Sequence, residues 1–220
     1  MKRILTASVL ACALLAGVPS LALAQAAAAP GAAPAAGSPS AMVLGNTTRI
    51  LSTLESRRAE FSKNRGALSQ FVTTEFNQLF DRDYAARLVL GTHGRGAADA
   101  DVALFSDALT SSLMQRYGSA LLDFNTRLQV RIKSETPLRG GAIVKVSSEF
   151  LRQGGEPVPV DYLLRKTGNQ WKVFDVMVEG VSFVQTFRNQ FDTPLSQKSI
   201  AQVAADIKAG RLQAQASGNK

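Results

Sequence analysis

The chain changes its hydrophobic period near residue 127, and this change constrains the fold more than any other feature of the sequence. Before it, apolar residues recur at intervals of three and four, which is the spacing of one face of a helix. Two stretches show the period clearly, one with Leu68, Phe71, Val72, Phe76, Leu79 and Phe80, the other with Val102, Phe105, Leu109, Leu113, Tyr117, Leu121 and Phe124. The pattern predicts helices over 68–80 and about 98–124. Ile50, Leu51 and Leu54 indicate another helix before them, and 84–90 a short one.

After residue 127, apolar and polar residues alternate, as in a strand with one dry face and one wet face. This alternation predicts strands over 128–133, 144–150 and 158–165. A fourth strand is expected over 171–179, where the residues are apolar on both sides, so the sequence leaves its inward face undecided.

Glycines at 154–155 and the pair Gly168-Asn169 are typical of hairpin turns, so we expect an antiparallel meander. A two-residue turn at 154–155 would place Phe150 opposite Pro159 and the dry face of one strand beside the wet face of the next. That connection must therefore have an odd length or contain a glycine bulge.

Helical signals return after Gly180. Ser182 and Gln185 have the spacing of a capping box before a helix that Pro194 is expected to end. Ser199 and Gln202 repeat that spacing before a last helix, which Gly210 should close. Helices, a one-sided antiparallel sheet and further helices together predict an α+β fold. We expect a cone-like curved antiparallel sheet of about four strands packed against several helices (NTF2/cystatin-like), a shape that can enclose a cavity.

The beginning of the chain predicts export. Lys2 and Arg3 precede an apolar run that is followed by small residues, so we interpret 1–24 as a signal peptide cleaved before Gln25. Cys12, the only cysteine, lies within that run and offers lipidation as a less favoured alternative. Residues 25–41 then have the composition of an Ala/Pro-rich linker, 42–210 the length of one domain, and 211–220 that of a polar tail.

The charge of the chain excludes some partners. Without the leader it has 23 basic and 17 acidic residues, a net charge of +6. The basic residues are scattered, which argues against nucleic-acid binding and favours diffuse attraction to anionic membrane surfaces. A mature chain without cysteine has neither a disulfide nor thiol chemistry.

Few residues are suited to catalysis. His93, the only histidine, lies in a glycine-rich loop without the partners that a metal site needs, so we expect no metal and no cofactor. No Gly-x-Ser-x-Gly motif is present, and Asp81 and Asp83 are better suited to helix capping than to catalysis. Asp175 as a base with Tyr162 as a hydrogen-bond donor is the best enzymatic candidate. The one-sided apolar surfaces themselves are compatible with either a filled core or a lined cavity.

Several segments together resemble one known family. They are Arg87-Leu-Val-Leu-Gly91, Tyr117-Gly-Ser-Ala-Leu-Leu122, Val158-Pro-Val-Asp-Tyr162, Trp171-Lys-Val-Phe-Asp-Val176, Glu179-Gly-Val-Ser182 and Phe187-Arg-Asn-Gln-Phe191. In order and spacing they are similar to the Mla-pathway phospholipid-binding family (MlaC, or toluene-tolerance family) over roughly 42–210. The resemblance implies a monomeric periplasmic carrier that buries the acyl chains of a glycerophospholipid. It also implies transfer between an outer-membrane MlaA–porin complex and an inner-membrane Mla ABC transporter complex.

On this hypothesis we expect the lipid-binding cavity to be lined by residues of the long helix, of the sheet and of the turn after the sheet. They are Phe105, Leu109, Leu113, Val144, Val146, Tyr162, Leu164, Val176 and Val181. Two alternatives stay open: an enzyme of the same fold that acts on a small apolar substrate with Asp175 and Tyr162, and an exported adaptor that binds protein through an apolar patch.

Overall fold

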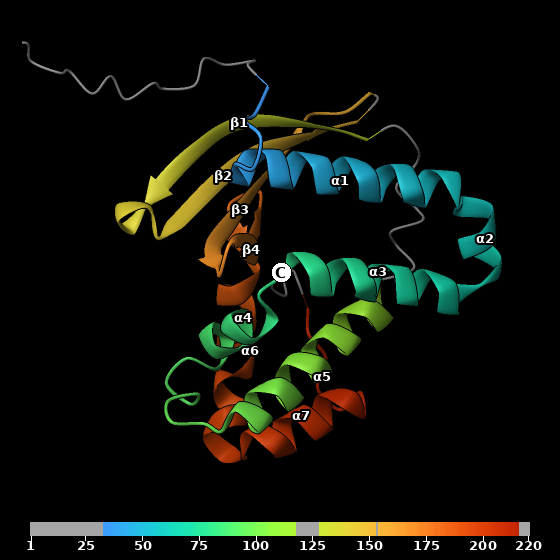
Figure 1. The fold of residues 1–220 in the computed structure, drawn as a ribbon. Coiled ribbons are helices and arrows are strands. Elements are labelled where there is room, and N and C mark those ends of the chain that lie inside the picture. Colours follow the sequence, from blue (N-terminus) through green and yellow to red (C-terminus); the bar gives the residue numbers. More distant parts are fainter. Residues whose placement is uncertain (1–32, 118–127, 153, 216–220) are drawn as a thin grey trace, which may run out of the picture.

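A computed structural model describes residues 33–117, 128–152 and 154–215 (Figure 1). The first helices are α1 (Pro39–Ser56), α2 (Arg58–Lys63), α3 (Arg65–Leu79), α4 (Arg82–Leu90) and α5 (Asp99–Tyr117). The strands are β1 (Gln129–Leu138), β2 (Ile143–Leu151), β3 (Val158–Thr167), β4 (Gln170–Val178) and β5 (Val181–Ser182), with a short 3₁₀ turn, η2 (Arg139–Gly141), after β1. Two helices follow, α6 (Phe183–Gln197) and α7 (Ile200–Lys208). The predicted α+β class is confirmed.

The sheet is an antiparallel meander in the order β1-β2-β3-β4-β5, so it has one short strand more than expected. Figure 1 shows that it curves, that α1 lies along it, and that α3 runs back beside α1 after the turn at α2. Helices α4 to α7 gather below the sheet as a second group. Within the part of the chain described, no helix is long and apolar enough to cross a membrane.

The register of β2 and β3 confirms the expected odd-length connection. Phe150 pairs with Val158 and Glu149 with Pro159, so dry residues face dry residues across the two strands. Thr167 pairs with Gln170, which leaves a two-residue turn at Gly168, where φ is 59°. The predicted hairpin there is confirmed.

A bulge in β4 explains why that strand is apolar on both sides. Leu163 pairs with Asp175 but its neighbour Leu164 pairs with Val173, so Phe174 is the extra residue. The bulge places Val173 on the face that packs against α1, while Phe174 meets the ring of Tyr84 from α4, 5.1 Å away. Both faces of β4 are therefore covered by helices.

Helix ends agree with the predicted caps in most cases. The Asp81 carboxylate accepts a hydrogen bond from the backbone of Tyr84, as expected of a cap, and the Ser199 capping box is present. Pro194 does not end α6, and that prediction is wrong: the helix continues to Gln197. Proline removes only its own N–H bond, and burial of Leu195, which is 7% exposed, holds the last turn in place.

The ends of the domain differ slightly from the composition boundaries. Helix α1 begins at Pro39, inside the segment 25–41, because Ser38 caps it and proline suits the first helical position. At the other end, Ala214 is fully buried, and its N–H donates to Ser112 Oγ at 3.3 Å. The predicted signal peptide, residues 25–32 of the predicted linker, and Leu121 and Phe124 of the predicted long helix lie outside the described residues.

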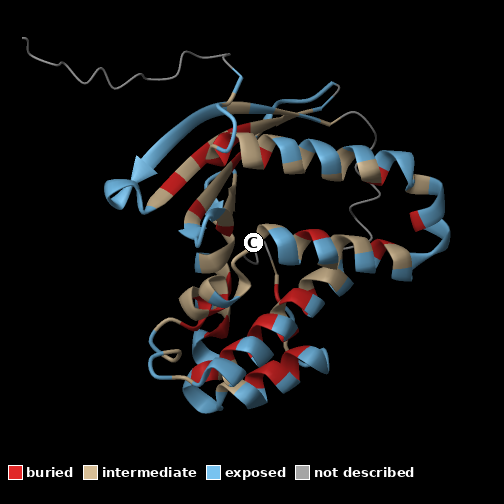
Figure 2. Cartoon of the chain, viewed as in Figure 1, coloured by how far each residue is buried: buried red, intermediate tan, exposed pale blue. Residues whose placement is uncertain are grey.

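The core consists of three clusters of buried residues, visible as red bands in Figure 2. The largest joins α4, α5, α6 and α7, where the rings of Phe105 and Phe191 meet edge to face at 5.6 Å. The second packs Val43 of α1 onto the sheet, and the third surrounds Phe61 at the α2 turn. Between the clusters, much of the apolar face of α3 is only half-buried, and this is where the molecule has a groove.

Candidate functional site

A groove of about 620 Å³ lies between α1, the end of α3 and the sheet. Its volume is within the range of small-molecule sites in proteins, roughly 300–1,000 Å³. Helix α1 and the start of α2 contribute Thr47, Thr48, Ile50, Leu51, Ser52, Leu54, Glu55 and Arg58. The other lining residues are Leu79, Phe80, Leu128, Gln129, Val130, Phe150 and Tyr162. The lining is therefore mostly apolar.

Helix α1 can form this wall because its apolar residues cover more than one face. Ile50 and Leu54 are one turn apart and pack with Phe61 at the α2 turn. Leu51 follows Ile50, is half-buried, and faces the groove without belonging to any of the three core clusters of the described residues. Ile50 and Leu54 thus border both the core and the groove, whereas Leu51 faces the groove alone.

The two ends of the groove differ in charge. One end, which we call the charged end, has Glu55 and Arg58; the other, the tyrosine end, has Thr47 and Tyr162. Eight residues of α1 separate Thr47 from Glu55, a rise of about 12 Å. The groove therefore extends about 12 Å along α1, with charged residues at one end and uncharged residues at the other.

The dry face of β2 runs along the groove in the same direction as α1 and over a similar length. Val43 at the start of α1 packs in the cluster of Val146, and Val146 pairs with Tyr162. Phe150, four residues further along β2, lines the groove and is about 13 Å from Val146. The dry face of β2 thus runs from the tyrosine end toward the charged end.

Tyr162 lies at the boundary between the groove and the core. Its ring lines the groove and also packs against the cluster of Val146 and Leu164. Burial raises the pKa of the Tyr162 phenol above its usual value, and hydrogen bonding with Thr47 and Ser148 acts in the opposite direction. Tyr162 therefore contributes both to the groove wall and to the packing of the sheet.

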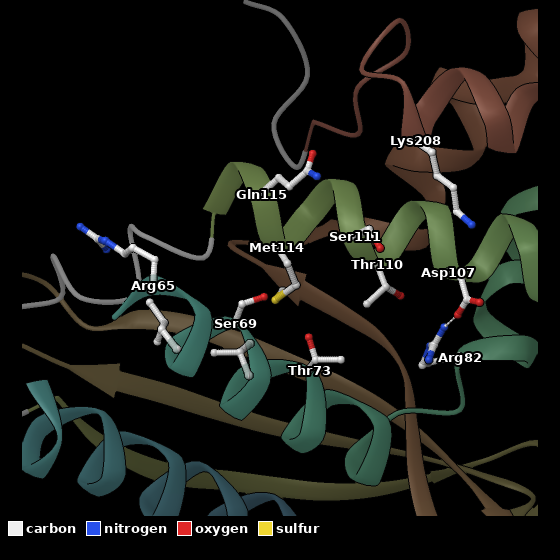
Figure 3. Close-up of a pocket in the computed structure, with 12 residues that line it drawn as sticks. Arg65, Ser69, Thr73, Arg82, Asp107, Thr110, Ser111, Met114, Gln115 and Lys208 are labelled. Carbon is white, nitrogen blue, oxygen red and sulfur yellow. Dashed lines mark hydrogen bonds and ion pairs between the residues drawn. The ribbon is translucent and has the colours of Figure 1, made fainter. Parts of the chain in front are cut away.

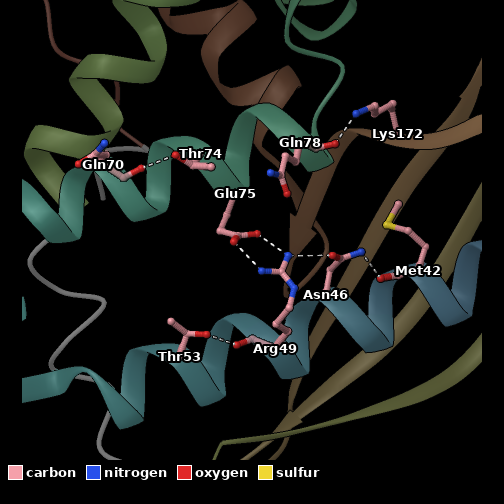
Figure 4. A network of polar contacts seen from close by, with 9 residues as sticks. All are labelled: Met42, Asn46, Arg49, Thr53, Gln70, Thr74, Glu75, Gln78 and Lys172. Carbon is pink, nitrogen blue, oxygen red and sulfur yellow. Dashed lines mark hydrogen bonds and ion pairs between the residues drawn. The ribbon is translucent and has the colours of Figure 1, made fainter.

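An ion pair fixes α1 to α3 on another side of α1 (Figure 4). Both Arg49 terminal nitrogens donate to the Glu75 carboxylate at 2.5 Å, and Asn46 accepts from Arg49 at 3.0 Å. This hydrogen bonding with Glu75 raises the pKa of Arg49. Glu75 is only 8% exposed although it lies within the apolar face of α3. The predicted helix over 68–80 gave no sign of this buried charge, because its partner is 26 residues away in the sequence.

Comparison with known proteins identifies the family. The MlaC protein family profile matches residues 45–209, most of the chain and all of the groove residues. The chain belongs to the MlaC family. It is 30% identical to the toluene tolerance protein ttg2D of Pseudomonas putida over 158 residues, which are 71% of this chain and 73% of that protein.

A solved structure supports the MlaC fold. The phospholipid-binding protein from Ralstonia solanacearum, determined in complex with a phospholipid, superposes with a TM-score of 0.69 at 23% identity. The match covers 78% of this chain and 97% of that one. The curved sheet with its surrounding helices is thus shared with a protein of known structure.

The nine residues predicted to line a lipid site lie in different parts of the structure. Among them, only Tyr162 lines the groove of this MlaC-family chain as described. Val144, Val146, Leu164 and Val176 belong to the cluster behind it, Phe105, Leu109 and Leu113 to the helical core, and Val181 is 49% exposed. The groove residues of α1 and the end of α3 were missed. Their signal was present in the apolar spacing of 50–54 and 68–80, but periodicity does not show which apolar residues face a cavity.

A second cavity, of about 770 Å³, lies between α3 and α5 (Figure 3). The side chains of Ser69 and Thr73 extend from α3 toward α5, and Met114 extends from α5 toward α3. At one end Arg82 forms an ion pair with Asp107. Polar and apolar surface contribute about equally to this cavity, so the groove is better suited to an apolar ligand.

The residues considered for catalysis have structural roles. Asp175 pairs with Leu163, next to Tyr162, so the two side chains point to opposite faces of the sheet. The Asp175 carboxylate accepts from Ser182 Oγ at 2.6 Å and from the N–H of Val184 at 3.0 Å, which anchors the start of α6. His93 contacts Asp192 at 2.9 Å. In the described ranges, no three His, Cys, Asp or Glu residues come together as a metal site.

Proposed function

We propose that this protein binds a glycerophospholipid, with acyl chains in the groove and the head group toward the charged end. The observation that carries the proposal is the groove itself, which extends about 12 Å along α1, is lined mostly by apolar residues, and has Glu55 and Arg58 at one end only. An amphiphile is the ligand class whose own polarity matches such a site. The phospholipid complex of the Ralstonia solanacearum protein, which shares the fold, supports the same ligand class.

The physical need for a carrier follows from the hydrophobic effect. Each methylene group transferred to water costs about 0.8 kcal/mol, so exposing two acyl chains costs on the order of 20 kcal/mol. Free phospholipid therefore crosses an aqueous compartment very slowly. A protein groove that replaces one apolar environment by another removes most of this cost without any chemical step.

We further propose that the protein is a monomeric periplasmic shuttle between the outer-membrane MlaA–porin complex and the inner-membrane Mla ABC transporter complex. The predicted signal peptide over 1–24 and membership of the MlaC family support this role. The positive charge of the chain favours approach to anionic membrane surfaces. Binding of a lipid in the groove needs no cofactor and no chemical step. Transfer of the lipid then depends on docking of the protein to the two membrane complexes.

The direct test is native mass spectrometry of protein purified from cells under gentle conditions, followed by lipid extraction. We expect a mass increment equal to one or more phospholipids, and phospholipid in the extract. Protein that purifies without lipid and takes up none from vesicles of phosphatidylethanolamine and phosphatidylglycerol would refute the proposal. It would favour the alternative of an adaptor that binds protein.

The enzyme alternative has less support, because Asp175 and Tyr162 do not share a site. Asp175→Asn distinguishes the two functions. A carrier with this substitution should still contain phospholipid, since Asp175 is on the face of β4 turned away from the groove. An enzyme that used the carboxylate as a base would lose turnover of its substrate.

A further inference from the structure

Tyr162 lines the groove from β3 and also packs on the solid core behind it, as Phe80 does from the end of α3. The core at this point is tightly filled: Val146 and Leu164 are fully buried and Val173 is 4% exposed. An acyl chain that advances along α1 from the charged end therefore meets the Tyr162 ring and, behind it, closely packed side chains.

The ring is held in place from two sides. It packs against the cluster of Val146 and Leu164, whose side chains are fully buried. The backbone of Tyr162 pairs with Val146 of β2 on one side and with Val176 of β4 on the other. A half-buried ring with this support is a fixed barrier, because turning it aside would disturb closely packed side chains.

We propose that Tyr162 closes the inner end of the groove and sets the longest acyl chain that the protein accepts. The inference rests on the proposed function and adds selectivity for chain length to it. The size of the side chain at position 162 then determines how far the terminal methyl group can reach. Leucine or alanine at this position lengthens the groove, tryptophan shortens it, and phenylalanine leaves its length unchanged.

The test measures the acyl composition of bound lipid in this series of variants. Each purified protein is incubated with vesicles of equal parts of dilauroyl, dimyristoyl, dipalmitoyl and distearoyl phosphatidylglycerol, re-isolated, and analysed by native mass spectrometry. For Tyr162→Leu and Tyr162→Ala we expect a shift toward longer chains by about one two-carbon step or more, because the removed ring atoms leave space of that order. For Tyr162→Trp we expect the opposite shift, and for Tyr162→Phe none.

Tyr84 provides a matched control. Its ring is also half-buried and packed, edge to face with Phe174 and 4.1 Å from the Arg165 guanidinium, but it lies on the other side of the sheet. Tyr84→Leu should therefore leave the acyl composition of bound lipid unchanged. Circular dichroism melting of all variants shows which of them are folded, and the phenylalanine and tryptophan variants keep the test valid if alanine prevents folding.

The outcomes separate the two proposals. If the wild-type protein binds no phospholipid, the proposed function fails. If it binds phospholipid but the acyl composition is the same with tryptophan, tyrosine and leucine at position 162, the role of Tyr162 is refuted and the proposed function stands. An equal shift in the Tyr84 control would also refute it, because the effect would then come from loosened packing.

Discussion

A charge placed in the groove should weaken lipid binding at least about 100-fold without unfolding the protein. Leu51 is the best position for it, because its side chain lines the groove at half-burial and is in none of the core clusters of the described chain. Leu51→Glu changes the size of the side chain only slightly and introduces a residue type that helices tolerate. The substitution therefore tests the groove and leaves the core intact.

The magnitude follows from what the carboxylate does to a bound acyl chain. It removes contact with about two methylene groups, at about 0.8 kcal/mol each, and brings a polar group next to hydrocarbon at a further cost of about 1–3 kcal/mol. The sum is about 3–5 kcal/mol, which corresponds to roughly 100- to 2,000-fold weaker binding. The free energy of unfolding should change by less than about 1 kcal/mol, as for substitutions outside the core.

The assay is titration of each protein with a fluorescent phospholipid presented in vesicles, together with urea unfolding. Leu104→Glu is the matched control, since Leu104 is 43% exposed on α5, away from the groove. We expect the control to bind lipid as the wild type does. Binding of equal strength by the Leu51 and Leu104 variants, with both folded, would show that lipid does not occupy this groove.

Three further predictions concern the scaffold. Phe105→Ala should lower the free energy of unfolding by about 3–5 kcal/mol in urea denaturation, because the ring is fully buried in the helical core. A loss below 1 kcal/mol would contradict this packing. Asp175→Asn should cost about 1–3 kcal/mol by weakening the anchor of α6, while lipid content measured by extraction stays the same; loss of lipid would argue for a direct role. Lys198 and Arg211 lower the pKa of Asp206 by hydrogen bonding, so its contribution to stability is present above the ordinary aspartate pKa and is lost as the pH falls through the lowered value. The difference in unfolding midpoint between the wild type and Asp206→Asn should therefore shrink in that acidic range, and a difference independent of pH would contradict the assignment.

Local patterns were sufficient for most of the secondary structure. The change of period near residue 127 correctly separated helices from strands, because each element must bury one face whatever its partner is. The conflict between Phe150 and Pro159 even predicted an odd connection, since a strand in the wrong register would turn its dry face to water. The end of α6 was predicted too early, because burial of Leu195 outweighs the hydrogen bond that Pro194 removes.

The site was harder to predict than the fold. Phe105 and Leu51 are both apolar residues at helical spacing, yet the first is in the solid core and the second faces the groove. The apolar pattern of α3 did not predict that Glu75 would be buried, because its ion-pair partner, Arg49, lies on α1. A residue's position in a helix shows which neighbours share its face, but not what lies opposite that face.

The sequence alone determined the order and type of the elements other than the short α2 and β5, the family, and the expectation of an exported chain without metal or thiol chemistry. These features depend on local spacing and residue type, and both can be read directly from the sequence. The tertiary structure decided where the apolar surfaces fail to meet, and so which side chains line a groove. That depends on the distances between packed elements: the bulge at Phe174 and the path of α1 over the sheet leave Tyr162 between a filled core and a space large enough for a ligand.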